Sequence, residues 1–197
     1  MTYTLKREEL GNGLLASVLE ALAKAYKEIG AEVYVVGAAA RDLSLKLLGA
    51  GSAPRRTMDL DVAVLLEKWD EYERLTEILI KDGFVKAPEK QRFYYCGIEN
   101  VRYEVDIVPF GDIAQEEMVA WPPEGNPVMS VRCFADVMKN ADEVSVEDRF
   151  DFRMASLSGQ WLIKLDAWCD RRLMTRKDAA DMQFILENAY ITLALSS

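Results

Sequence analysis

The sequence predicts an α/β (α+β) fold: a small mixed sheet with flanking helices and a helical C-terminal segment. Two observations lead to this prediction. Segments whose apolar residues recur every three or four positions, as in helices, alternate with short strand-like runs. From about residue 155 the helical spacing continues alone, so we expect a core over 1–150 and a helical segment over 151–197. The chain has 197 residues, half of them hydrophobic, which is enough for one sizeable core.

The first half of the chain predicts helices and strands in alternation. Apolar residues at helical spacing predict a helix over 14–29 that ends at Gly30, and a run of valines predicts a strand that ends at Gly37. The expected elements are helices over 14–29, 38–48 and 69–81, strands over 32–36 and 57–64, and a hairpin of 91–96 with 101–109 around a turn at 97–100.

The second half is predicted more coarsely. Short strands are expected near 128–134 and 143–146, separated by loop. A helix over 158–171 follows, and Thr175 with Asp178 has the spacing of a capping box that opens a last helix to about residue 189.

The composition excludes several kinds of chemistry. A net charge of −9 argues against a broad basic groove for nucleic acid, although a small basic patch can still hold an RNA end. The chain has no histidine, which excludes a histidine base and histidine-ligated zinc. Its three scattered cysteines predict core thiols in a reducing compartment. Because no apolar signal core or membrane-length window is present, we expect a cytoplasmic protein.

The most informative motif is the pair Asp59 and Asp61 on the predicted strand over 57–64. Residues two apart on a strand point to the same face, so both carboxylates lie together while Leu60 and Val62 point to a core. Adjacent carboxylates repel each other, and a divalent cation relieves that repulsion because hard cations prefer oxygen ligands. The pair therefore predicts a metal site.

Two further features accompany this pair. Gly37 ends the preceding strand and leads into a helix that contains Arg41. Asp106 lies on the polar face of a later strand, where Glu104 is an alternative to it. A glycine turn permits close approach of a phosphate to the backbone, and the helix that follows offers it amide groups.

Together these features resemble the nucleotidyltransferase superfamily, whose mixed sheet carries a glycine turn, an Asp-x-Asp strand and a third carboxylate. Segment 36–42, Val-Gly-Ala-Ala-Ala-Arg-Asp, is similar to the Gly-Gly-x-x-x-Arg-Asp segment in the head domain of CCA-adding enzymes and poly(A) polymerases. Segment 164–181 looks more like the AbiEii type of toxin nucleotidyltransferase. The chain departs from the pattern at Ala38, where the superfamily usually has serine or glycine.

The resemblance implies a metal-dependent nucleotidyltransferase that moves an NMP group from an NTP to an RNA, protein or small-molecule hydroxyl and releases pyrophosphate. It implies that three carboxylates hold Mg²⁺ or Mn²⁺ and that other residues bind the nucleotide, some from the helical segment. The implied metal and catalytic residues are Asp59, Asp61 and Asp106, and the implied nucleotide-binding residues are Gly37, Ala38, Arg41, Lys164, Asp178 and Asp181. The implied partners are an NTP, an RNA such as tRNA, and a cognate antitoxin protein, with no membrane.

Several alternatives stay open at the level of sequence. Ala38 and the acidic composition also fit a catalytically silent member of the fold that acts as a binding or regulatory module, and the same carboxylates also fit a phosphohydrolase. Arg41 and Asp42 are equally consistent with a structural ion pair. The basic residues over 171–177 fit either a charged helix end or a phosphate contact, and Asp178 fits either the nucleotide cleft or the helix cap.

Overall fold

The computed structural model describes residues 1–10, 13–49, 59–96 and 102–195, with side chains to residue 189. It contains one large mixed sheet and a separate two-stranded hairpin. The strands of the large sheet are β1 (Thr2–Leu5), β2 (Tyr34–Val36), β3 (Asp59–Leu65), β4 (Phe84–Lys86), β5 (Arg92–Cys96), β6 (Arg102–Phe110), β9 (Asp142–Val146) and β10 (Phe150–Met154). The hairpin consists of β7 (Met118–Ala120) and β8 (Val128–Ser130).

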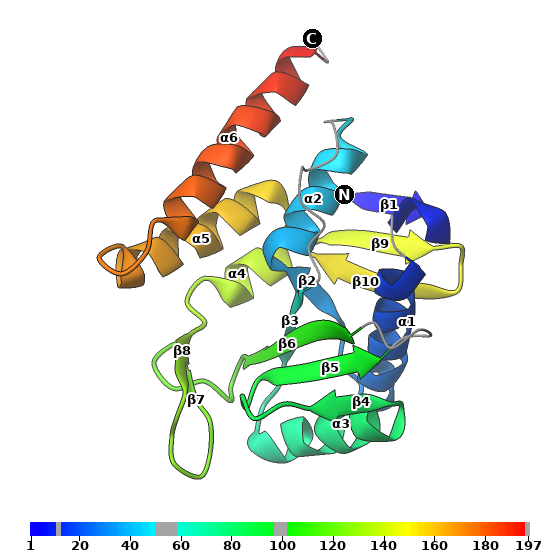
Figure 1. Cartoon of the computed structure of the whole chain (residues 1–197), viewed down its shortest axis with the longest axis vertical. Coiled ribbons are helices and arrows are strands. Elements are labelled where there is room, and N and C mark those ends of the chain that lie inside the picture. The colour runs from blue at the N-terminus through cyan, green and yellow to red at the C-terminus, as the bar shows by residue number, and fades with distance from the viewer. Residues whose placement is uncertain (11–12, 50–58, 97–101, 196–197) are drawn as a thin grey trace.

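The helices lie around this sheet (Figure 1). They are η1 (Arg7–Leu10), α1 (Gly13–Glu28), α2 (Gly37–Leu47), α3 (Trp69–Lys81), α4 (Phe134–Lys139), α5 (Leu157–Arg171) and α6 (Lys177–Leu195). Among these helices none combines the length and the apolar character that crossing a membrane requires.

The sheet is mixed, with the order β1-β9-β10-β2-β3-β6-β5-β4. The parallel pairs are β1 with β9, β10 with β2, and β3 with β6, and the other neighbours are antiparallel. The three central strands β2, β3 and β6 therefore come from well-separated parts of the chain. The predicted α/β fold with a mixed sheet is confirmed.

Side chains that alternate along β3 separate two cores. Leu60, Val62 and Val64 belong to the core that α1 and α3 cover, while Ala63 belongs to a second core on the opposite face with residues of α4. Asp59 and Asp61 share the parity of Ala63, so they lie on the second face. The large apolar core on one face thus fixes which way the carboxylates point on the other.

Local sequence explains the helices of the first core. The buried residues Leu19, Leu22 and Tyr26 recur at helical spacing in α1, and Gly30 follows at φ +75°. The N–H of Ala31 donates to the carbonyl of Tyr26, which closes the end of that helix. In α3 acidic residues occupy the first turn and Lys81 the last, which suits the helix dipole.

Several predictions for single elements need correction. Phe134 begins the helix α4 and does not belong to a strand. The residue that caps α5 is Ser156, not Ser158, which lies inside the helix. Helix α6 extends beyond residue 189. Two of the three thiols, those of Cys96 and Cys169, are exposed and not in a core. Residues 57 and 58 of the predicted strand and the turn at 97–100 lie outside the described residues.

Candidate active site

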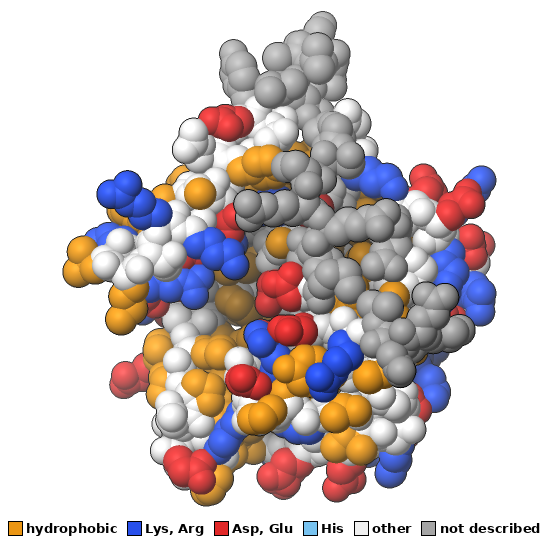
Figure 2. All heavy atoms as spheres, in the orientation of Figure 1, with side chains coloured by type: hydrophobic (Ala, Val, Ile, Leu, Met, Phe, Trp, Pro, Cys, Tyr) orange, Lys and Arg blue, Asp and Glu red, His pale blue; other side chains and the backbone are white. Residues whose placement is uncertain are grey.

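Four carboxylates form two neighbouring pairs on the second face of the sheet. The parallel register of β3 and β6 places Asp61 beside Asp106 and Asp59 beside Glu104. Adjacent strands are about 4.8 Å apart, and in-register side chains on them point the same way. The sheet therefore brings together the three carboxylates that the sequence analysis selected, together with the alternative, Glu104. Figure 2 shows acidic and basic side chains close to one another on the central part of this surface.

Asp61 is the most electrostatically unusual residue of this group. The pKa of its carboxyl is raised from 3.8 to about 6, chiefly by burial and also by the nearby charges of Asp106 and Asp59. Lys164 and Lys177 act in the opposite sense and lower it, without cancelling the effect of burial. An incompletely compensated carboxylate of this kind is a strong ligand for a cation and a frequent mark of a functional site.

Gly37 packs directly against Asp61. Val36, the last residue of β2, pairs with Asp61 across the antiparallel ladder, and Gly37 follows at φ +66°. A Cβ at position 37 would lie 2.1 Å from Oδ2 of Asp61, a distance at which atoms clash. Both the backbone conformation and this contact therefore require glycine.

The start of α2 lies next to the carboxylates as well. No side chain caps this end of the helix, so the amide groups of its first turn have no side-chain acceptor at Val36. Ala38 is the second residue of the helix and is half-buried. Its methyl group offers no hydrogen bond, so only backbone amides remain to bind an anion here.

Asp106 is already bound by an arginine. Arg92 of β5 lies opposite Asp106 in the hairpin, and its guanidinium donates to both carboxylate oxygens at 2.8 and 2.9 Å. The same guanidinium reaches Glu104 at 2.9 Å. Sequence reasoning missed Arg92, although its position on the strand paired with 101–109 was a usable signal.

The remaining predicted residues form an ion-pair network between α2, α5 and α6. Lys164 Nζ lies 2.8 Å from Asp181 and 3.6 Å from Asp178. Arg41 bonds Asp181 at 3.0 Å and Asp42 at 2.8 Å, so the structural ion pair considered for Arg41 is present. The network joins the C-terminal helices to the helix that follows Gly37.

Asp178 is the buried centre of this network. Its side chain is fully buried and accepts two bonds from Arg171, at 2.6 and 2.7 Å. This guanidinium holds the pKa of the Asp178 carboxyl below its usual value, with Lys164 adding to the effect. The hydroxyl of Thr175 accepts a hydrogen bond from the backbone N–H of Lys177, at the start of α6. The carboxylate of Asp178 instead accepts from Arg171, so Asp178 belongs to the ion-pair network.

The donor set fits a divalent cation in part. Asp61 and Asp59 offer carboxylate oxygens that no described cation binds directly, whereas Asp106 would share its oxygens with Arg92. Among the described residues no group of three or more Asp, Glu, Cys or His side chains is already arranged as a metal site. The metal site proposed from the sequence therefore remains a prediction.

Comparison with known proteins finds a likeness in structure. An antigenic nucleotidyltransferase-like protein from Paracoccidioides brasiliensis matches with a TM-score of 0.54 and 17% sequence identity, over 95% of this chain and 78% of that one. The chain has a nucleotidyltransferase-like fold. No protein-family model matches the sequence. A search of curated proteins gives no match either.

Two weaker likenesses are to further nucleotidyltransferase-fold proteins. The lincosamide antibiotic adenylyltransferase LnuA gives a TM-score of 0.47 at 14% identity, over 92% of this chain and 96% of that one. The Thermotoga maritima CCA-adding enzyme gives 0.35 at 22% identity, over 52% of this chain and 23% of that one. None of these likenesses singles out the AbiEii type within the nucleotidyltransferase-like fold.

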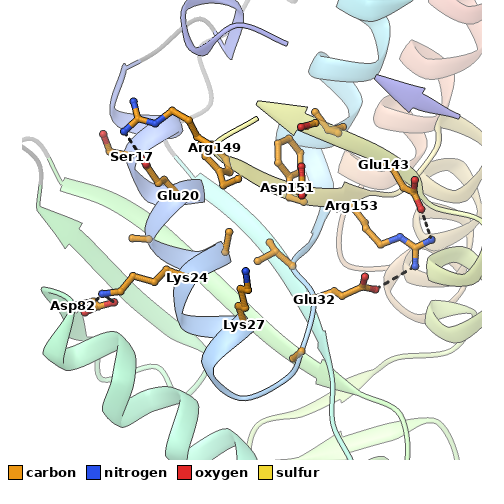
Figure 3. Close-up of a pocket in the computed structure, with 18 of the residues that line it drawn as sticks. Ser17, Glu20, Lys24, Lys27, Glu32, Asp82, Glu143, Arg149, Asp151 and Arg153 are labelled. Carbon is orange, nitrogen blue, oxygen red and sulfur yellow. Dashed lines mark hydrogen bonds and ion pairs between the residues drawn. The ribbon is translucent and has the colours of Figure 1, made fainter. Parts of the chain in front are cut away.

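A separate open depression of about 1100 Å³ lies between α1 and the strands β9 and β10. Figure 3 shows several of its charged residues paired with one another. The pairs are Glu20 with Arg149, Lys24 with Asp82, and Arg153 with Glu32 and Glu143. The carboxylates of the candidate site do not line this depression.

Proposed function

We propose that the protein is a metal-dependent nucleotidyltransferase that moves an NMP group from an NTP to a hydroxyl and releases pyrophosphate. The observation that carries the proposal is the half-buried Asp61, in register beside Asp106 and in contact with Gly37 at the start of a helix. The nucleotidyltransferase-like fold supports it independently.

In this proposal Asp59, Asp61 and Asp106 hold Mg²⁺ or Mn²⁺, which would supply charge neutralisation at the phosphates when bound. The acceptor oxygen attacks the α-phosphorus while the bond from that phosphorus to the β-phosphate oxygen breaks. Pyrophosphate leaves with the bonding electrons, and the hydroxyl proton passes to the Asp106 carboxylate. Arg92 keeps that carboxylate in position, so we assign Arg92 a positioning role.

The nucleotide is proposed to bind between the turn at Gly37 and the C-terminal helices. The first amides of α2, including that of Ala38, face the phosphates in place of a serine hydroxyl. Lys164 supplies positive charge from α5, and the network of Arg41, Asp178 and Asp181 holds it there. In this proposal α5 and α6, the helices of segment 151–197, complete the cleft of the core, whereas residues 151–154 belong to β10.

The acceptor is tested directly with NTPs labelled at the α-phosphate. Each of the four nucleotides is incubated with the protein, Mg²⁺ and total RNA, lysate protein or small metabolites, and both label transfer and pyrophosphate are measured. We expect equal amounts of transferred label and pyrophosphate with at least one nucleotide, and neither with Asp59→Asn/Asp61→Asn. Inorganic phosphate released without pyrophosphate would instead indicate a phosphohydrolase.

A second candidate function is a catalytically silent binding module. The two hydrogen bonds that Arg92 donates to Asp106 favour this candidate, because the arginine competes with a cation for the third carboxylate. Failure to release pyrophosphate with every nucleotide and acceptor, despite nucleotide binding, selects this candidate. A toxin role with a cognate antitoxin rests on the resemblance of segment 164–181 alone, and growth arrest on expression that requires Asp61 is its test.

A further inference from the structure

The connection between α5 and α6 exposes an unusual apolar pair. Leu173 is 96% exposed and Met174 is 89% exposed, the highest values among the large hydrophobic side chains of the described residues. Both lie between α5, which ends at Arg171, and α6, which begins at Lys177. We call residues 172–177 the α5–α6 tip. Exposing two such side chains is unfavourable in water, which points to a contact with something other than water.

Basic residues flank this apolar pair on both sides. Arg172, Arg176 and Lys177 belong to the tip, which contains no acidic residue. None of these three side chains forms an ion pair with a carboxylate of the described part of the chain, whereas the neighbouring Arg171 is held by Asp178. A local cluster of unpaired positive charge on a chain of net charge −9 favours an anionic partner.

The tip is continuous with the candidate active site. Lys177 is the first residue of α6, and Asp181 of that helix pairs with Arg41 of α2 at 3.0 Å. Helix α2 begins at Gly37, which packs against Asp61. Lys164 is occupied by Asp181 and Asp178. The tip is therefore joined to the carboxylates through α6 and α2.

Side-chain chemistry at the tip suits nucleic acid. The Arg172 guanidinium lies 5.6 Å from the centre of the Trp168 ring, which fixes a flat cation at the surface. Arginine pairs with phosphates and also stacks on bases, and exposed apolar side chains contact unstacked bases. An anionic membrane offers phosphates as well, but it has no strand that could reach Asp61.

We propose that the α5–α6 tip binds the phosphates and bases of a single-stranded nucleic acid and directs its terminal hydroxyl to Asp59 and Asp61. This inference rests on the proposed function and names the class of acceptor for the same site. RNA and DNA strands share the chemistry that the tip recognises, and the experiment separates them.

The experiment measures binding of fluorescein-labelled single-stranded RNA and DNA by anisotropy, over a series of salt concentrations, without metal or NTP. The tip variants are Arg172→Ala/Arg176→Ala and Leu173→Ser/Met174→Ser. The matched control is Lys68→Ala/Arg74→Ala, which removes two exposed cations at and near the start of α3. All variants change exposed side chains, and circular dichroism confirms their folding.

We expect the arginine variant to weaken binding about tenfold and to reduce the slope of log affinity against log salt by about 1.4, which corresponds to two phosphate contacts. The serine variant should weaken binding without changing that slope, and the control should bind like the wild type. Tighter binding of one of the two strands identifies the natural acceptor.

Three results would overturn the proposal: no binding of either strand at low salt, equal binding by wild type and tip variants, or tip-dependent binding of phosphatidylserine vesicles without binding of either strand. Because the assay omits metal and NTP, its failure is distinct from failure of the proposed transfer reaction. In turn, Asp59→Asn/Asp61→Asn should bind the strands at least as tightly as the wild type even if no transfer occurs.

Discussion

At the scale of single residues, Gly37 and Asp61 depend on each other. The absence of a side chain at position 37 leaves the space that Oδ2 of Asp61 occupies. This contact seats the half-buried carboxylate of Asp61 against the end of β2, and none of the described residues forms an ion pair with it. The position of the most perturbed acid in the site therefore follows from one glycine.

Gly37→Ala is expected to destabilise the protein more than the same change at Gly30. Both residues have positive φ, which costs about 1 kcal/mol for alanine, but only position 37 adds a clash with Asp61. We expect an additional cost of about 2 kcal/mol from this clash, measured by urea unfolding. Equal costs at the two positions would show that the contact with Asp61 is unimportant.

Asp61 is expected to make stability depend on pH in the absence of metal. Its pKa is raised in the folded protein, so its stabilising contribution is complete below about pH 4 and is lost as pH rises through about 6. Relative to Asp61→Asn, the free energy of unfolding of the wild type should fall by about 3 kcal/mol across this range. Glu73→Gln, a change of an exposed acid on α3, should show no such difference. A pH-independent difference between the wild type and Asp61→Asn would contradict the assigned burial.

At the scale of elements, the ion-pair network decides how the C-terminal helices meet the core. Asp181 of α6 forms ion pairs with both Arg41 of α2 and Lys164 of α5, so its carboxylate joins the three helices. Arg41 also lies over the ring of Phe184 at 5.0 Å. These contacts, rather than a large apolar interface alone, set the orientation of α6 at its N-terminal end.

Asp178→Asn is expected to destabilise the protein at neutral pH by about 2 kcal/mol, because two charge-assisted bonds from Arg171 are weakened in a buried setting. The pKa of Asp178 is lowered, so its contribution is present above about pH 4 and is lost as pH falls through the folded-state pKa. The difference from wild type should therefore shrink in acid. Asp170→Asn, at an exposed neighbour, is the control, and a comparable loss there would refute the special role of Asp178.

Elements with strong periodicity were predictable, and those that depend on distant partners were not. The helices α1 and α3 and the alternation of β6 follow from local apolar spacing, which survives into the structure. By contrast β1 has four residues and pairs with β9, about 140 positions away, so nothing local marks it as a strand. The short helix α4 and strands β4, β7 and β10 were also missed, because each has at most six residues and so shows too little of a periodic pattern.

In the candidate site too, some features were predictable from the sequence and others were not. Asp59, Asp61 and Asp106 were selected from alternation on strands, and the β3–β6 register places them side by side. The partners of charged groups were not predictable, because Arg92 and Arg171 reach their carboxylates through pairings that only the assembled sheet and helices define. Sequence spacing identifies faces, whereas ion-pair partners require the third dimension.

At the scale of the whole molecule, the two faces of the sheet differ. One face carries the large core with α1 and α3, and the other carries the smaller core with α4 and, on β3 and β6, the carboxylates. The large core is thus kept apart from the candidate site. We expect changes to Asp59 and Asp61 to affect ligand binding while leaving the fold intact.

The central claim is that Asp59 and Asp61 bind a divalent cation together with an NTP. The most direct measurement is the melting temperature with Mg²⁺ alone, with NTP alone and with both, for the wild type and two charge-matched variants. These are Asp59→Asn/Asp61→Asn and, as control, Asp70→Asn/Glu73→Gln on α3. We predict that Mg²⁺ and NTP together raise the melting temperature of the wild type and the control by more than the sum of their separate effects, because ligand bound to the folded state stabilises it. The site variant should lose this joint effect, and an unchanged joint shift in that variant would contradict the account.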